Sequence, residues 1–275
     1  MIRNGTRNRS EGSAGPTFGV GAGWLGCRRQ TRGRHARAAL SILVCSISIA
    51  TLIIVGVVGY RRFQTAIDTS RCNMNLKIIG LALESYRNVY GSYPPAYVCD
   101  KNGQPMYSWR VLLLPFIGEK DLYKRFRLDE AWNGPHNRLL VTQEPTCYKC
   151  PADISHAGAT NYVAIVGPAA PWEGAQPRSL EDLRSATGGE SVLVAEMVDS
   201  GIIWMEPRDL TESEALQGVN RPGVRCISSH HPGGAWVWLT GEMRFLQDET
   251  PALELRSLVE IIPNRLRRTK GSGVH

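Results

Sequence analysis

The longest apolar segment of the chain is the 23-residue run from Ala38 to Tyr60, which contains no charged side chain. At a rise of about 1.5 Å per residue, a helix of this length spans the hydrocarbon core of a bilayer, which is about 30 Å thick. A buried core helix would carry a polar stripe, and a cleaved signal peptide has a shorter apolar region that ends in small residues. This run ends at Tyr60, directly before Arg61 and Arg62. We therefore predict a transmembrane helix over residues 38–60.

A second helical pattern follows the apolar run without interruption. No proline occurs between Tyr60 and Pro94. Apolar or aromatic side chains recur in this segment at alternating spacings of four and three residues. The members of this stripe are Cys72, Leu76, Ile79, Leu83, Tyr86 and Tyr90. Such spacing is typical of one face of an amphipathic helix. Gly91 and Pro94-Pro95 end the pattern, so we predict one helix from about Arg37 to Tyr90, half in lipid and half packed on a domain.

Short helical and strand-like segments follow one another irregularly along the rest of the chain. Two short helices are expected over Ser108–Phe116 and Glu119–Phe126, and runs of apolar residues predict five strands. The expected strands are Asn161–Val166, Val192–Met197, Val224–Ser228, Trp236–Leu239 and Met243–Leu246. Only Thr240-Gly241 separates the last two, which predicts a tight hairpin with Gly241 at positive φ.

Capping residues mark two further helix starts. Residues 179–182 resemble a capping box between Ser179 and Asp182, and Thr250-Pro251 places an N-cap candidate before a proline at the first helical position. Because strands and helices do not alternate regularly, the pattern favours an antiparallel sheet over a parallel one. We predict an α+β fold in which an antiparallel sheet packs on the amphipathic half of the long N-terminal helix.

The net charge of +7 is distributed unevenly along the chain. Residues 1–62 contain ten arginines and one acid, Glu11, a net charge of +9 that leaves −2 for the remainder. Because residues 61–262 lack a basic patch, we expect no nucleic-acid partner. More basic residues precede the apolar run than follow it, which predicts a cytoplasmic N-terminus and an extracytoplasmic body. The basic segments 1–37 and 263–275 contain few large apolar side chains and are expected to be disordered.

Five segments of the body resemble a known family. The stretch SRCNMNLKIIGLALESYRNVYGSYPPAY at 70–97 is similar to the signature of a bacterial family of pseudopilin-like proteins, domain of unknown function family 1559. The other segments lie at 108–140, 147–153 (CYKCPAD), 160–167 (TNYVAIVG) and 230–246 (HHPGGAWVWLTGEMRFL), in the family's order. The resemblance implies a pilin-like fold, with a long helix packed on an antiparallel sheet. It also implies the lipid bilayer and other pilin-like or envelope proteins as partners.

Two features depart from the family pattern. The segment GRHARAALSILV, at the start of the apolar run, lacks the Phe and the Glu of a prepilin signal. We therefore expect a permanent anchor rather than a processed pilus subunit. In the C-terminal motif, Thr240 stands where the family has an aspartate, so no carboxylate role carries over to that position.

Five of the seven cysteines lie in the body, where an extracytoplasmic location permits disulfides. They are Cys72, Cys99, Cys147, Cys150 and Cys226. The family resemblance implies a bridge between Cys72 and Cys150, and Cys99 with Cys147 is the second candidate. Spacing alone leaves the connectivity open. Cys147 and Cys150 also form a Cys-x-x-Cys pair that is compatible with a redox motif or half of a zinc site, although Pro151 and the lack of a second such pair weaken both alternatives.

Two histidines and two tryptophans are candidate ligand contacts. His230 and His231 precede a Pro-Gly-Gly bend and suggest a metal site that includes Glu242, although a turn in which one imidazole bonds the backbone is the interpretation we favour. Trp236 and Trp238 share one strand face. Such a pair stacks on a sugar ring or, more often, belongs to the core.

No catalytic motif is recognisable in the chain. It contains no Gly-x-Ser-x-Gly elbow, no phosphate loop and no His-Glu-x-x-His, so we expect no catalysis, no catalytic residue and no cofactor. The sequence favours a single-pass protein of the inner membrane whose envelope domain has a structural or binding role. An extracytoplasmic module that binds a glycan or a metal is the alternative, and a hydrolase is the third candidate.

Overall fold

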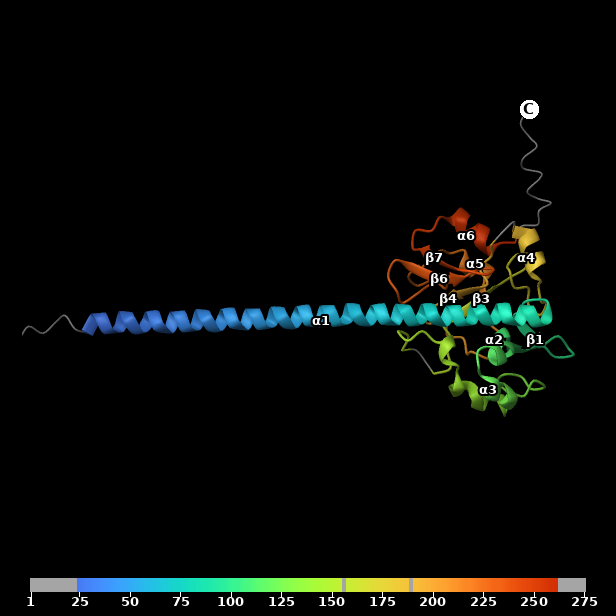
Figure 1. Ribbon diagram of the computed structural model, residues 1–275, viewed down its shortest axis with the longest axis horizontal. Helices are drawn as coiled ribbons and strands as arrows, with labels where there is room; N and C mark the ends of the chain where they lie inside the picture. Colours follow the sequence, from blue (N-terminus) through green and yellow to red (C-terminus); the bar gives the residue numbers. More distant parts are fainter. Residues whose placement is uncertain (1–23, 155–156, 188–189, 262–275) are drawn as a thin grey trace, which may run out of the picture. The chain divides into compact units, whose positions relative to one another are not determined.

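The computed structural model describes residues 24–154, 157–187 and 190–261 (Figure 1). The chain divides into two units, with the boundary between Tyr60 and Arg61. The helix α1 (Trp24–Tyr90) contributes to both. The first unit contains the N-terminal part of α1, and the second contains the rest of α1 together with all the other elements.

The N-terminal part of α1 is apolar, and residues 37–60 are exposed throughout. Among the described residues, the helix from Arg37 is the one that is long and apolar enough to cross a membrane. Its few polar side chains bond within the helix: the hydroxyls of Ser46 and Thr51 each donate to a carbonyl oxygen about one turn earlier, at 2.8 Å. Polar groups in lipid need such internal partners. The predicted membrane helix is therefore present, and the protein is membrane-anchored.

The helix α1 begins earlier than the sequence predicted. Its first residue is Trp24, inside the segment 1–37 that was expected to be disordered. Arginine is a good helix former, and a segment that extends an existing helix does not bear the cost of nucleation. Residues 1–23 and the expected basic tail at 263–275 lie outside the described residues.

The C-terminal part of α1 carries the predicted buried stripe. Its fully buried members are Cys72, Leu76, Ile79 and Leu83. Tyr86 is half-buried and Tyr90 is exposed, so the stripe ends one turn before the helix does. Gly91 ends the helix at a φ of 81°, and its N–H donates to the Arg87 carbonyl at 2.8 Å.

A five-stranded sheet with the order β5-β3-β4-β6-β7 forms the centre of the second unit. Its strands are β3 (Tyr162–Val166), β4 (Val194–Glu196), β5 (Leu210–Thr211), β6 (Gly234–Trp238) and β7 (Met243–Gln247). All neighbouring pairs are antiparallel except β3 and β5, which are parallel. The sheet is therefore mixed rather than purely antiparallel. β6 and β7 form the predicted hairpin, with Gly241 at a φ of 117°.

One predicted strand does not form. Residues 224–228 belong to a loop, in which Ile227 makes an isolated bridge with Val219. Both edges of β4 are already paired, to β3 and to β6. Asn220 and Gly223 also turn the chain at positive φ. The apolar character of the segment therefore reflects the burial of Cys226 and Ile227, not pairing in a sheet.

The two faces of the sheet are buried against different elements. Along β3, Tyr162 and Ala164 belong to the core on the side of α1, whereas Val163 and Ile165 belong to the core on the opposite side. This alternation follows from the strand period of two residues. The helix α6 (Ala252–Val259) covers the opposite face with buried leucines and a valine. The sheet is thus the middle layer between α1 and α6 (Figure 1).

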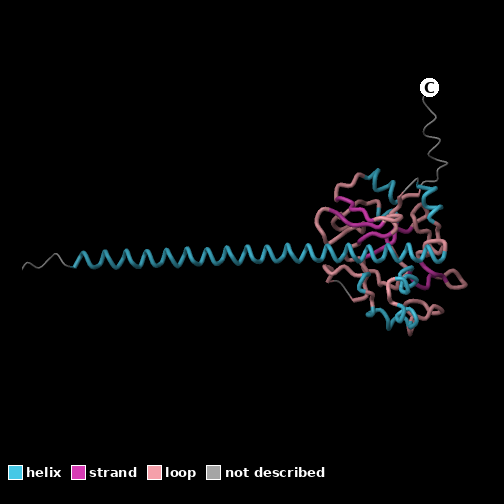
Figure 2. The backbone as a smooth tube through the Cα atoms, in the orientation of Figure 1, coloured by secondary structure: helices cyan, strands magenta, loops and turns pink. Residues whose placement is uncertain are grey.

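The segment 97–148 lies on the other side of α1 (Figure 2). Its elements are β1 (Tyr97–Cys99), β2 (Pro105–Ser108), α2 (Trp109–Leu113), the 3-10 helix η1 (Leu114–Phe116), α3 (Lys120–Arg125), and the 3-10 helices η2 (Asn137–Gln143) and η3 (Thr146–Tyr148). α2 with η1 and α3 confirm the two predicted short helices. Apolar side chains of this segment, of α1 and of the sheet form one core cluster. The last part of α1 is therefore the central helix of the second unit.

Helix starts agree with the capping signals in one of the two predicted cases. At α4 (Leu180–Thr187) the N–H of Asp182 donates to Ser179 Oγ at 3.0 Å, and the N–H of Ser179 donates to the Asp182 carboxylate at 2.9 Å. At α6 the N-cap is Pro251. The hydroxyl of Thr250 bonds instead to a carbonyl of the preceding turn at 2.7 Å. The remaining short helix is α5 (Glu212–Ala215).

The helix α1 approaches the sheet closely at Gly80. A Cβ atom at this position would lie 2.0 Å from Cδ2 of the buried Trp238 ring. Glycine in a helix interior is normally unfavourable by about 0.5–1 kcal/mol relative to alanine. Here it makes room for an indole ring between the helix and the sheet, which gives this glycine a packing reason.

Candidate functional site

A disulfide joins α1 to the loop that follows η3. It links Cys72 and Cys150, which are separated by 78 positions in sequence and by 5.3 Å between their Cα atoms. This confirms the pairing that the family resemblance implied. A closed loop of this length stabilises the fold by about 4 kcal/mol in the chain-entropy account.

His231 lies directly beside this disulfide. Its Nε2 atom is 4.0 Å from the Cys150 Sγ atom, and the side chain is buried. The two sulfur atoms and the imidazole nitrogen all lie within 4.8 Å of one another. Among the described residues, this is the group of metal-ligating side chains that the fold brings together.

Two hydrogen bonds fix the tautomer of His231. The Thr69 hydroxyl donates its proton to the Thr65 carbonyl at 2.7 Å. It therefore accepts at 2.9 Å from the Nδ1 atom of His231, which must carry the proton. The lone pair on Nε2 is left free and faces Cys150. Burial, with a smaller contribution from His230, lowers the pKa of His231 below its ordinary value, which favours the neutral ring near pH 7.

A buried carboxyl lies on the α1 side of the sheet. Glu196 is 3% exposed and pairs across the sheet with Tyr162. Its Oε2 atom accepts from the Trp236 N–H at 3.3 Å, whereas its Oε1 atom has no hydrogen-bond partner within the described parts of the chain. Burial raises the pKa of Glu196. A carboxyl in this position is a candidate for ligand binding or proton uptake.

Two adjoining cavities lie beside this region. A small one of about 10 Å³ is lined by Cys150, Glu196 and His230, among others. An open one of about 500 Å³ shares four lining residues with it, namely Met197, Val198, Ser228 and Ser229. Asp199 and Asn220 also line the open cavity, and both have positive φ (46° and 51°). Such strained positions cluster at functional sites.

The other predicted ligand contacts do not converge on this site. His230 is exposed, and Glu242 is exposed in the hairpin turn beyond the far end of β6, where its carboxylate lies 3.5 Å from Arg244. A strand of five residues at about 3.3 Å each separates Glu242 from the bend that follows His231. The structure therefore does not bring Glu242 together with His231, as the alternative metal site would require.

The tryptophan pair belongs largely to the core. Trp238 is buried against α1, and Trp236 is half-buried with its ring centroid 5.2 Å from that of Phe245. Since Trp238 is covered by the helix, the pair does not form an open platform for a sugar ring. Trp238 therefore belongs to the core, and Trp236 packs against it from a half-buried position.

The second predicted disulfide does not form. Cys99 and Cys147 are free thiols. Cys147 is buried in the core cluster, and burial raises the pKa of its thiol to about 12. Since Cys150 pairs with Cys72, the Cys-x-x-Cys segment is neither a redox pair nor half of the zinc site considered from the sequence.

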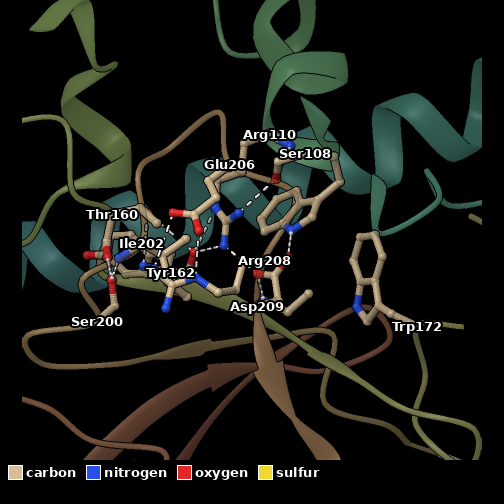
Figure 3. A network of polar contacts seen from close by, with 12 residues as sticks. Ser108, Arg110, Thr160, Tyr162, Trp172, Ser200, Ile202, Glu206, Arg208 and Asp209 are labelled. Atoms are coloured by element: carbon tan, nitrogen blue, oxygen red, sulfur yellow. Dashed lines mark hydrogen bonds and ion pairs between the residues drawn. The ribbon is translucent and has the colours of Figure 1, made fainter. Parts of the chain in front are cut away.

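A second buried polar group lies at the centre of the domain (Figure 3). The guanidinium of Arg110 donates to the Tyr162 carbonyl at 3.0 and 2.8 Å and to the Ser108 hydroxyl at 2.7 Å, and it forms an ion pair with Asp209. Arg110 and Asp209 are both buried. Asp209 also accepts from the backbone N–H of Ala164 at 2.8 Å.

This network joins three parts of the fold. Arg110 lies in α2, Tyr162 in β3, and Asp209 directly before β5. The Trp109 indole donates to Asp209 at 3.2 Å, and its ring stacks 4.6 Å from the guanidinium carbon of Arg110. Because each donor and acceptor meets a protein partner, we assign the network to packing rather than to chemistry.

Sequence reasoning missed Thr69, Glu196 and Asp209. Thr69 lies outside the apolar stripe of α1, and its partner His231 is 162 positions away. Glu196 lies in an apolar strand-like run, and no basic residue close to it in the sequence indicates a buried ion pair. Arg110, inside the apolar segment SWRVLLLPF, was the one available signal that a buried acid would be needed.

Comparison with known proteins finds a family match over part of this chain. The family model described as "Protein of unknown function (DUF1559)" matches residues 69–190. The match includes both disulfide cysteines and ends before β4, so the C-terminal resemblance over 230–246 lies outside it. No curated protein and no solved structure matches the chain significantly.

Proposed function

We propose, from the premise that residues 69–190 of this chain belong to the DUF1559 family, that the protein is a pseudopilin-like envelope protein with a structural or binding role. The observation that carries the proposal is the division of α1. Its first part suits a bilayer, and its second part is the central helix of the folded domain. One helix thus supplies both the anchor and the core, as in pilin-like subunits.

The orientation follows from charge. Arg28, Arg29, Arg32, Arg34 and Arg37 precede the membrane run, and only Arg61 and Arg62 follow it. The positive-inside rule places the N-terminus in the cytoplasm and the domain outside the inner membrane. The Cys72–Cys150 disulfide supports this placement because disulfides persist in oxidising compartments.

The orientation is tested with an impermeant maleimide on spheroplasts. Leu253 is a suitable labelling position because it is 83% exposed on α6, so Leu253→Cys is introduced with Cys99→Ser to remove a competing thiol. The proposal predicts labelling of residue 253 on intact spheroplasts and of Cys27 only after permeabilisation. The reverse pattern would place the domain in the cytoplasm and remove the proposed envelope role.

The outer face of α1 supports a role in assembly. Met74, Leu81 and Val89 are each more than half exposed on the part of α1 that belongs to the domain. Exposed apolar side chains in a row are typical of protein interaction sites, and we propose that this face packs on the helix of another pilin-like protein. No catalysis is part of the proposal, since the buried ion pair of Arg110 and Asp209 is fully used in packing.

Photo-crosslinking in native membranes tests the assembly role. A photoreactive residue at Leu81 is expected to capture a neighbouring pilin-like or envelope protein in cells. The control is the same residue at Lys101, which is exposed in the turn between β1 and β2. Equal capture from both positions, or none from Leu81, would contradict an assembly role for this face.

A further inference from the structure

We propose that Cys72, Cys150 and His231 bind a zinc ion when their disulfide is reduced. The oxidation state of the two cysteines would then decide whether the domain holds a metal. This inference stands on the geometry around the disulfide and does not depend on the proposed envelope role. It differs from the zinc site considered in the sequence, because it uses Cys72 and His231 rather than Cys147.

The three ligand atoms already lie close to the required spacing. Their mutual distances are all within 4.8 Å. Tetrahedral zinc with bonds of about 2.3 Å to sulfur and 2.0 Å to nitrogen holds such ligands roughly 3.5–3.8 Å apart. Reduction lets the sulfurs separate, and Cys150 lies in a loop, where small shifts are tolerated. Movements on the order of 1 Å therefore convert the disulfide into a two-thiolate, one-imidazole site.

The surroundings orient the ligands as zinc sites require. A ligating histidine usually donates its second ring N–H to a neighbouring acceptor, which fixes the tautomer. Thr69 provides this acceptor at 2.9 Å from Nδ1, since its own proton goes to the Thr65 carbonyl. The backbone N–H of Cys150 donates to the Asn161 side chain at 2.9 Å, which holds this cysteine in place.

The side of the site nearest to solvent is that of Cys150. The small cavity beside Cys150 adjoins the open cavity of about 500 Å³. The small cavity holds about one water molecule, so a reductant and a metal ion reach the sulfurs from this side once the loop that carries Cys150 shifts. Three protein ligands leave the fourth zinc position for water, as in zinc sites with an open coordination position.

A dithiol reductant supplies the two electrons that cleave the disulfide. Two thiols of the reductant are oxidised to a disulfide while the Cys72–Cys150 bond takes up two electrons and two protons, which gives two protein thiols. Zinc then displaces those two protons and bonds to both thiolates and to the Nε2 lone pair. A disulfide oxidant reverses the change: it takes two electrons from the thiolates and two protons from solvent, becomes two thiols, and leaves the Cys72–Cys150 bond re-formed and the metal released.

The test uses the full-length chain in detergent, oxidised or reduced and then freed of reductant under nitrogen. It is titrated with Co²⁺ as a spectroscopic probe and then with Zn²⁺. We expect the reduced chain to show thiolate-to-cobalt charge-transfer bands at one Co²⁺ per chain, which zinc displaces, and the oxidised chain to show none. His231→Ala should abolish the bands, and Thr69→Val should weaken zinc binding by roughly 10–100-fold.

His35→Ala is the control, since this imidazole is exposed on the N-terminal part of α1 and should leave zinc binding unchanged. Thermal melts of each oxidised variant show whether it is folded before reduction. If the reduced chain binds Co²⁺ no better than the oxidised chain, or if His231→Ala binds like the parent, the proposal is overturned. Bands that persist in a Cys72→Ser, Cys150→Ser variant would likewise assign the metal to other cysteines.

Discussion

The two parts of α1 have the same secondary structure but opposite relations to their surroundings. Between Ala38 and Tyr60 every side chain is exposed and almost every one is apolar. From Cys72 to Leu83, by contrast, one face is completely buried, and the exposed face combines Lys77 with the apolar side chains of Met74, Ile78 and Leu81. The contrast shows that helix formation alone does not reveal the environment of a helix. The distribution of burial around its circumference does, because the part between Ala38 and Tyr60 buries no face, whereas the part from Cys72 to Leu83 buries one face in the core.

Loss of the disulfide is expected to have the largest effect on the stability of the domain, and a matched change in the membrane part should have none. Replacing Cys72 and Cys150 by serine should lower the free energy of unfolding of the domain by about 4 kcal/mol, since the closed loop spans 78 positions. Cys45→Ser, in the membrane part of the same helix, should leave it unchanged. Denaturation followed by tryptophan fluorescence measures both, because six of the seven tryptophans lie in the domain.

Leucine truncation should distinguish the two parts in the same way. Leu76→Ala leaves a cavity under the sheet and should cost about 3 kcal/mol of domain stability. Leu52→Ala changes a side chain that is 71% exposed and should cost the domain nothing. Equal losses in the same denaturation experiment would mean that residues 38–60 are buried against protein.

Glycine substitutions provide a smaller, more local comparison. Gly80→Ala should destabilise the domain by about 2 kcal/mol, because the new methyl group overlaps the Trp238 ring. Gly59→Ala meets no atom within 4 Å and should leave the domain unchanged. A red or blue shift of tryptophan emission in the Gly80 variant alone would report the displaced indole.

The smallest expected effect is the dependence of domain stability on pH. The membrane part of α1 carries no charged side chain between Ala38 and Tyr60 and should not contribute to it. Burial raises the pKa of Glu144 to about 7, above its ordinary value of 4.5. The folded state therefore binds more protons than the unfolded state between these values, so the free energy of unfolding falls as pH rises from about 4.5 to 7. Glu144→Gln should remove about 1–2 kcal/mol of this loss, allowing for partial exposure.

Urea titrations at pH 5 and pH 8 measure this effect. The variant should gain stability relative to the parent at pH 8 and show little difference at pH 5. Glu181→Gln, at an exposed position on α4, is the control. A gain that is the same at both pH values would show that burial of the Glu144 charge is not the cause.

The sequence predicts the elements whose signal is local. The stripe from Cys72 to Leu83 is a helical repeat, and Gly91 marks the end of the helix. The Thr240-Gly241 hairpin follows from its turn, because a short loop between two strands needs positive φ. The Cys72–Cys150 bridge came from the family resemblance rather than from spacing.

The features that the sequence did not predict depend on distant partners. β5 has only two residues and pairs in parallel with β3, which leaves no periodicity to detect. Residues 224–228 read as a strand, yet β4 had both of its edges occupied. The contact between Thr69 and His231 needs the finished fold, because neither residue carries a local signal for the other.

The central claim is that the two parts of α1 face lipid and water respectively on their exposed sides. Spin labels at Leu52 and at Leu81 test it directly, since both leucines are more than half exposed on the same helix. The chain is reconstituted in liposomes with Cys27, Cys45 and Cys99 replaced by serine. The account predicts that the label at 52 collides mainly with oxygen and the label at 81 mainly with a water-soluble nickel complex. Similar accessibility at the two positions would contradict it.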